Sequence, residues 1–133
     1  MSKENLEILQ TLNLRKDHTR EIGGYEGLKR ILETFYSRIL QDIMIGYFFK
    51  PFELEELIAH QAQFTYKALG GTERNDKLRP LGELHKPMAI TEGHFYRRHK
   101  ILEETLITHE VPENIVQLWL EMDLKFKKII VSR

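Results

Sequence analysis

One histidine, His85, lies where an apolar side chain is expected. Proline is tolerated only in the first turn of a helix, so Pro80 opens a short helix and Pro87 ends it within about two turns. On this helix His85 shares one face with Leu81 and Met88. A buried imidazole needs a partner, so two interpretations stay open: a core histidine bonded to a backbone carbonyl, and a ligand of a metal ion or haem iron.

A second group of polar residues interrupts an apolar row on the helix predicted over about residues 53–69. His60 and Gln61 share one face of that helix with Leu57 and Phe64. A buried amide leaves several hydrogen-bonding sites to satisfy, so a glutamine in an apolar row needs a partner. Either both polar side chains reach water from the margin of the helix, or they face a cavity that holds a polar ligand.

The composition excludes several classes of protein. The chain has 133 residues, which is the size of one domain, and its 20 basic and 20 acidic residues cancel. This balance favours neither nucleic acid nor an anionic membrane as a partner. The chain has no cysteine, which excludes disulfides, thiolate metal sites and haem attachment through Cys-x-x-Cys-His. Because no signal peptide or membrane-spanning run is present, we expect a cytoplasmic protein.

The hydrophobic pattern predicts an all-α domain, because long stretches have a period of 3.6 residues and no stretch alternates as a strand does. Long helices are expected over about residues 24–41, 53–69, 92–109 and 112–131. The aromatic stretch 43–52 is expected to form a corner of the core, and residues 1–18 an N-terminal extension with a short helix. Taken alone, Tyr36 is expected at the boundary of its helix with its hydroxyl at the surface, since tyrosine is intermediate in burial.

The order of several short motifs resembles the group I truncated haemoglobins. The motifs are Ile-Gly-Gly at 22–24, Phe35-Tyr36, Phe48-Phe49, Ala-Leu-Gly-Gly at 68–71, His85, and Ile-Thr-Glu-Gly-His-Phe at 90–95. Each motif is common, but the ordered set is specific. The resemblance implies that residues 19–133 form a truncated (2-on-2) globin domain, in which a sandwich of helices surrounds haem.

The same resemblance implies haem b as the cofactor, with His85 as the proximal ligand of the iron. Phe49 is then similar to the phenylalanine that packs on the porphyrin, Tyr36 to the distal hydroxyl donor and Gln61 to its amide companion. Further residues expected to line the haem are Leu57, His60, Phe48, Phe95, Leu81 and Met88. His60 is also a candidate second ligand of the iron, as in some family members, and the alternative is a histidine at the haem edge.

The resemblance also implies a function. Dioxygen bound to ferrous haem has partial superoxide character, so two donors in a dry pocket slow its release and favour chemistry over transport. We therefore expect O2, NO or CO as ligands and nitric oxide dioxygenation or a peroxidase-like reaction at Tyr36 and Gln61, with an unidentified reductase as electron donor. A gas sensor or oxygen-storage globin without turnover and a haem-free helical interaction module stay open. The expected assembly is a monomer or weak dimer.

Arg98 and His99 interrupt the apolar face formed by Phe95, Leu102 and Leu106. The family commonly has an apolar residue there, lining the distal pocket or a gas tunnel. A buried guanidinium is costly unless it is paired or turned toward a haem propionate or solvent. These arrangements of Arg98 stay open, and we expect an obstructed tunnel. The chain has no Glu-x-x-His and no His-Glu-x-x-His motif, which disfavours a di-iron bundle and a zinc protease.

Overall fold

The computed structural model of the chain describes residues 17–72, 90–125 and 127, and all its elements are helices. In chain order they are the 3-10 helix η1 (His18–Ile22) and the α-helices α2 (Gly24–Gln41), α3 (Gly46–Phe49), α4 (Leu54–Ala68), α6 (Glu92–Thr108) and α7 (Glu113–Lys125). The predicted all-α class is therefore correct for these residues. None of the helices in this part of the chain is long and apolar enough to cross a membrane.

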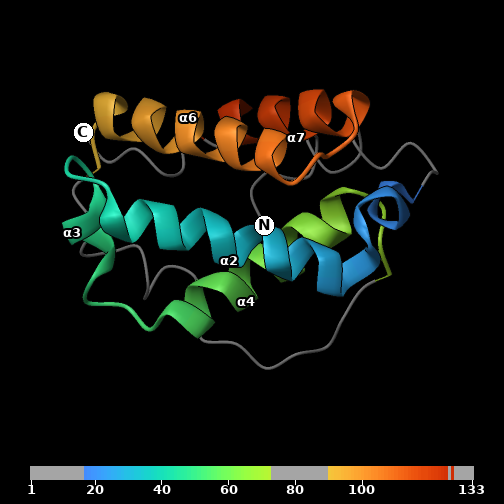
Figure 1. Ribbon diagram of the computed structural model, residues 1–133, viewed down its shortest axis with the longest axis horizontal. Helices are drawn as coiled ribbons and strands as arrows, with labels where there is room; N and C mark the ends of the chain where they lie inside the picture. The colour runs from blue at the N-terminus through green and yellow to red at the C-terminus, as the bar shows by residue number, and fades with distance from the viewer. Residues whose placement is uncertain (1–16, 73–89, 126, 128–133) are drawn as a thin grey trace.

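The helices lie in two layers, which Figure 1 shows with α6 and α7 side by side above α2 and with α4 below it. Helix α2 lies between α6 on one side and α4 on the other, packs against both, and also contacts α3 and η1. At the start of the domain the backbone N–H of His18 donates to the carbonyl of Leu69 at 2.9 Å, which joins η1 to the end of α4. Residues of α2 therefore reach both halves of the core.

Helix α2 begins where the sequence predicts, because Gly23 adopts the left-handed conformation with φ of 89° and ends η1. Its buried face consists of Gly27, Leu28, Ile31, Leu32, Phe35, Tyr36 and Ile39. Tyr36 is only 5% exposed, so the expectation from this residue alone, a hydroxyl at the surface, was wrong. A Cβ atom at Gly27 would lie 1.8 Å from the carbonyl oxygen of Ile22, so η1 can approach α2 only at a glycine.

Helix α4 has its two polar residues, His60 and Gln61, at the margin of its buried face. Its buried residues are Leu57, Ile58, Ala62, Thr65 and Ala68. In the row that the sequence singled out, Leu57 is buried, whereas His60, Gln61 and Phe64 are half-buried. The buried face of α4 thus includes the small residues Ala62, Thr65 and Ala68, and the polar side chains lie beside it.

Helix α6 begins with a reciprocal cap within the Ile-Thr-Glu-Gly-His-Phe motif. The backbone N–H of Thr91 donates to Nδ1 of His94 at 3.2 Å, and the backbone N–H of His94 donates to the hydroxyl of Thr91 at 3.3 Å. Two donors at the start of the helix are thereby satisfied. The motif thus has a structural role in starting α6, which is separate from any role of Phe95.

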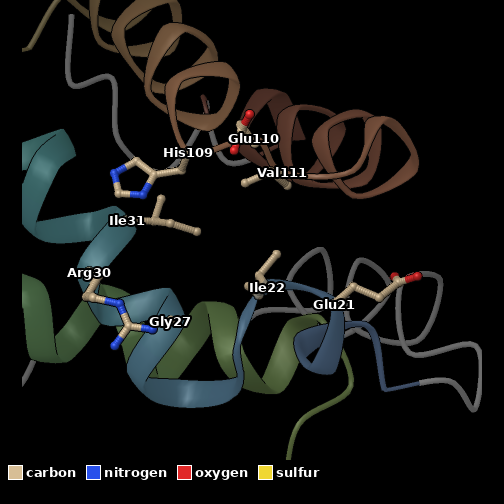
Figure 2. A pocket seen from close by; sticks show the side chains of 8 residues that line it. All are labelled: Glu21, Ile22, Gly27, Arg30, Ile31, His109, Glu110 and Val111. Carbon is tan, nitrogen blue, oxygen red and sulfur yellow. The ribbon is translucent and has the colours of Figure 1, made fainter.

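A polar cavity of about 240 Å³ lies between the start of α2 and the turn from α6 to α7 (Figure 2). Its walls are formed by Glu21, Ile22, Gly27, Arg30, Ile31, His109, Glu110 and Val111. Not one of the described residues that the sequence assigned to a functional site is among them. The cavity is therefore distinct from the functional site that the sequence predicts.

Candidate functional site

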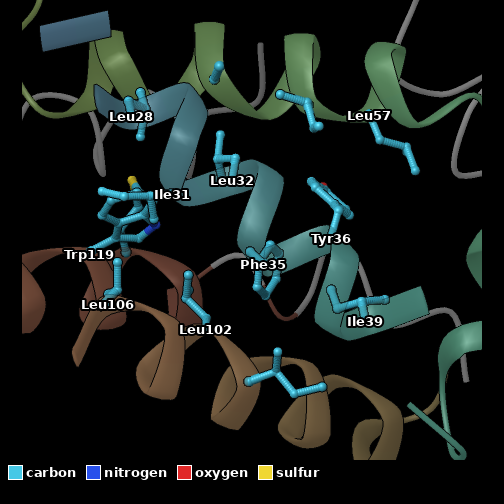
Figure 3. Packing of buried hydrophobic residues seen from close by; sticks show 14 of the residues in the cluster. Leu28, Ile31, Leu32, Phe35, Tyr36, Ile39, Leu57, Leu102, Leu106 and Trp119 are labelled. Carbon is cyan, nitrogen blue, oxygen red and sulfur yellow. The ribbon is translucent and has the colours of Figure 1, made fainter. Parts of the chain in front are cut away.

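The candidate site is centred on Tyr36, on the side of α2 that faces α4. Figure 3 shows Tyr36 pointing to the side of α2 on which Leu57 of α4 lies, whereas the neighbouring Phe35 points toward Leu102 on α6. The Tyr36 ring lies 6.2 Å from the ring of Phe49 and 5.1 Å from that of Phe35, measured between centroids. Three helices thus bring Tyr36, Phe49 and Leu57 into the same hydrophobic core.

The Tyr36 hydroxyl is held in its protonated form. Burial raises the pKa of this hydroxyl to about 12, the positive charge of Arg98 acts against that rise, and the negative charge of Asp123 adds to it. A phenol with this pKa keeps its proton at physiological pH. Tyr36 can therefore act as a hydrogen-bond donor inside an apolar cluster.

Helix α4 contributes a second donor. The Gln61 side chain is half-buried, and its amide nitrogen donates to the hydroxyl of Thr65 at 3.2 Å. Thr65 is completely buried, so it fixes the orientation of the Gln61 amide. His60 is also half-buried, but adjacent residues on a helix project about 100° apart. His60 and Gln61 therefore point in different directions from α4.

The remaining predicted residues that the structure describes occupy different surroundings. Phe48 is half-buried, and its ring lies 4.6 Å from that of His94, which joins α3 to the start of α6. Phe95 is fully buried, and the ring of His99 is stacked on it at 6.1 Å. The structure therefore places Phe49 beside Tyr36 and gives Phe48 and Phe95 contacts on α6.

His85, Leu81 and Met88 lie outside the described residues, as do Pro80, Pro87 and most of the N-terminal extension. Their predicted roles stay predictions. Among the residues that are described, no three histidine, aspartate or glutamate side chains gather in a way that could hold a metal ion.

A buried ionic cluster lies behind Tyr36, and the sequence indicated only part of it. Arg98 donates to Oδ1 of Asp123 at 2.6 Å, and Nδ1 of His99 lies 2.7 Å from Oδ2 of the same carboxylate. Arg98 and Asp123 are 6% and 4% exposed. Of the arrangements left open for Arg98, the structure shows the paired one, and the partner is Asp123, which was not predicted from the sequence. Its position provides a signal, because it follows Trp119 by one helical turn and so faces the core.

The charges in this cluster stabilise one another. Burial acts to raise the pKa of the Asp123 carboxyl, but the charge of Arg98 and the hydrogen bond from His99 hold that pKa below its ordinary value. Burial likewise acts against the charge of Arg98, but Asp123 and Tyr36 together more than offset it, so the pKa of the guanidinium is raised. Both residues are thus charged in the folded protein, and the pair links α6 to α7.

Comparison with known proteins identifies the family. A family model described as bacterial-like globin matches residues 20–131. The chain is 33% identical over 100 residues to group 1 truncated haemoglobin GlbN of Synechocystis sp., covering 72% of this chain and 80% of the relative. It is also 33% identical over 95 residues to GlbN of Mycolicibacterium paratuberculosis, covering 71% of this chain and 69% of that protein.

Solved structures agree on the fold. The crystal structure of a truncated haemoglobin from Tetrahymena pyriformis in the Fe(III) form superposes with a TM-score of 0.75 at 22% identity, over 89% of this chain and all of that one. The 2/2 haemoglobin from Synechococcus sp., in the cyanomet state with covalently attached haem, gives a TM-score of 0.73 at 21% identity, over 86% and 98% of the two chains. The chain therefore belongs to the bacterial-like globin family, as a group 1 truncated globin with the 2-on-2 fold, and binding of haem and gas ligands follows from that family.

Proposed function

We propose that this chain binds haem b and holds a diatomic gas against Tyr36 and Gln61, with His85 as the proximal ligand of the iron. Membership of the globin family supports the haem and the gas. The observation that carries the distal assignment is the burial of a protonated Tyr36 beside Phe49. When bound, the haem supplies a redox-active iron that takes a gas ligand.

The described residues fit such a group. Phe49 and Leu57 offer buried apolar surface, which suits the face of a porphyrin. Tyr36 and Gln61 offer neutral donors on α2 and α4, two helices that pack against each other, and these suit a ligand with partial negative charge. Covalent attachment, which is stated for the Synechococcus protein, cannot occur here through cysteine because the chain has none.

The two donors have separate tasks in this proposal. Tyr36 has a single O–H, and its pKa of about 12 ensures that the proton is present. Gln61 has two N–H groups, of which one donates to Thr65, so the other remains for the ligand. Donors that are fixed before the ligand arrives stabilise negative charge without further reorganisation. Thr65 is then the residue that orients the amide.

The reaction class that we propose is oxidation of nitric oxide by dioxygen. Nitric oxide, dioxygen and one electron give nitrate, and an external reductase supplies the electron. Slow release of dioxygen favours this reaction over transport. The identity of the reductase, a cytoplasmic location and a monomeric or weakly dimeric state stay predictions.

The test compares Tyr36→Phe with Tyr47→Phe in the full chain loaded with haem. Tyr47 is 63% exposed, so its variant carries the same chemical change outside the site. A hydrogen bond to a charged group contributes about 1.5–3 kcal/mol, so Tyr36→Phe should release dioxygen about ten- to a hundredfold faster and consume nitric oxide more slowly. Equal release rates in the wild type and both variants would refute the role of Tyr36. Slow release without nitric oxide consumption would indicate a sensor or storage globin.

A further inference from the structure

The buried guanidinium of Arg98 lies close to the candidate site, separated from Tyr36 by the ring of Phe35. Its Cζ atom is 5.3 Å from the centroid of the Phe35 ring, and that ring is 5.1 Å from the ring of Tyr36. Phe35 therefore contacts both the cation and the tyrosine. Because Arg98 is only 6% exposed, water and salt screen its charge far less than they screen a surface charge.

Asp123 fixes the guanidinium in place but does not cancel its effect on Tyr36. The carboxylate accepts from Arg98 at 2.6 Å through Oδ1, while Oδ2 is engaged by His99 at 2.7 Å. Of the two opposite charges, Arg98 has the larger influence on the Tyr36 hydroxyl. The positive member of the pair, which lies against Phe35, therefore acts on this hydroxyl more strongly than the negative member does.

We infer that Arg98 is a positioning residue of the distal site, whose charge polarises the Tyr36 hydroxyl and makes the site favour ligands with negative charge. The inference rests on the proposed function, in which Tyr36 donates to the ligand. A nearby positive charge draws electron density from the O–H group, and this strengthens the donor. Asp123 sets the position of the charge and moderates it.

The experiment uses the full chain loaded with haemin and two probes. Fluoride binding to the ferric protein measures the preference for an anion, and the C–O stretching frequency of the reduced protein with carbon monoxide reports the local field. The variants are Arg98→Met, Arg98→Lys and Asp123→Asn, and Arg98→Met is also made with Tyr36→Phe. Arg98→Lys retains the positive charge and can replace the single contact with Asp123, although it loses the planar group that lies over Phe35, so it serves as the charge-retaining control.

Arg98→Met should weaken fluoride binding about three- to tenfold, the size typical of coupling between neighbouring residues. It should also raise the C–O frequency, because less positive charge faces the ligand. Arg98→Lys should return both values toward those of the wild type. Asp123→Asn should move both in the opposite direction, since it removes the opposing negative charge. With Tyr36→Phe already present, Arg98→Met should have little further effect.

Two results would overturn the inference. The first is that Arg98→Met and Asp123→Asn shift both probes in the same direction, as general damage to the fold would. The second is that Arg98→Met has the same effect with and without Tyr36→Phe, since Arg98 would then not act through Tyr36. If Tyr36→Phe alone changes neither probe, the proposed function fails instead.

A double variant covers the case in which Arg98→Met does not fold. Arg98→Met with Asp123→Leu removes both buried charges together, which is often neutral or stabilising. Because Arg98 has the larger influence on Tyr36, the double variant should still weaken fluoride binding, though less than a folded Arg98→Met protein would. Unchanged fluoride affinity in this variant would also overturn the inference.

Discussion

Replacing Asp123 by asparagine should strongly destabilise the fold. The carboxylate is 4% exposed and accepts from Arg98 at 2.6 Å and from His99 at 2.7 Å. Asparagine has nearly the same volume, so the substitution removes the charge and leaves the packing in place. Breaking a buried pair by removing one charge costs about 3–5 kcal/mol. For a domain of this size, that cost lowers the melting temperature by roughly 10–20 °C.

Thermal and urea unfolding followed by circular dichroism would measure this effect on the haem-loaded chain. Glu103→Gln is the matched control on α6, because Glu103 pairs with Lys100 at 2.9 Å and their side chains are 38% and 58% exposed. We expect no resolvable change in this control, since exposed ion pairs contribute little. If Asp123→Asn were as mild as the control, the reasoning that the buried pair holds α6 to α7 would be refuted.

The stabilisation that Asp123 provides should depend on pH. The folded-state pKa of Asp123 lies below its ordinary value, so the charged carboxylate stabilises the fold above the unfolded-state pKa of about 3.9. That stabilisation is lost as the pH falls through the folded-state pKa. The difference in unfolding free energy between the wild type and Asp123→Asn should therefore be constant near neutral pH and shrink below about pH 4. A difference that grows in acid would contradict this assignment.

Two further predictions concern Gly27 on α2 and His60 on α4. Gly27→Ala places a Cβ atom 1.8 Å from the carbonyl oxygen of Ile22 and should lower the unfolding free energy by about 1–3 kcal/mol or more. The control Gly93→Ala should be tolerated, because its Cβ meets only the Thr91 hydroxyl at 3.8 Å. Equal effects of the two variants in urea unfolding would contradict the close approach of η1 to α2. His60 and Gln61 project in different directions from α4, so His60 should not bind the iron when Gln61 faces it. We therefore expect the reduced protein to show the absorption spectrum of five-coordinate haem both in the wild type and in His60→Ala. A six-coordinate wild-type spectrum that becomes five-coordinate in the variant would instead identify His60 as an iron ligand.

The sequence predicted the helices better than it predicted which side chains they bury. The bounds of α2 agree because Gly23 and Gly24 mark its start and the apolar period is regular. Tyr36 was misplaced when it was considered alone, since its burial depends on Phe49 and Leu57 from two other helices. Periodicity on one helix cannot supply such a tertiary relation.

The polar residues show the same limit. On α4, the apolar row of the sequence included Gln61, which is half-buried, whereas Ala62 and Thr65 outside that row are fully buried. Asp123 was missed because a lone aspartate on a helix usually faces water. Only its distance to Arg98, 25 positions earlier in the chain, explains why it is buried. The ordered motifs did identify the family, since they reflect the whole fold rather than one helix.

The most direct test of the central claim is the visible absorption spectrum of the purified chain after addition of haemin, ferric and then reduced under argon. His85→Ala and His109→Ala should be measured beside the wild type, because His109 is an exposed histidine away from the proposed site. We predict a haem spectrum with one axial histidine in the wild type and in His109→Ala, and its loss or marked change in His85→Ala. If the wild type shows no haem band, or if His85→Ala matches the wild type, the proposed haem site is wrong.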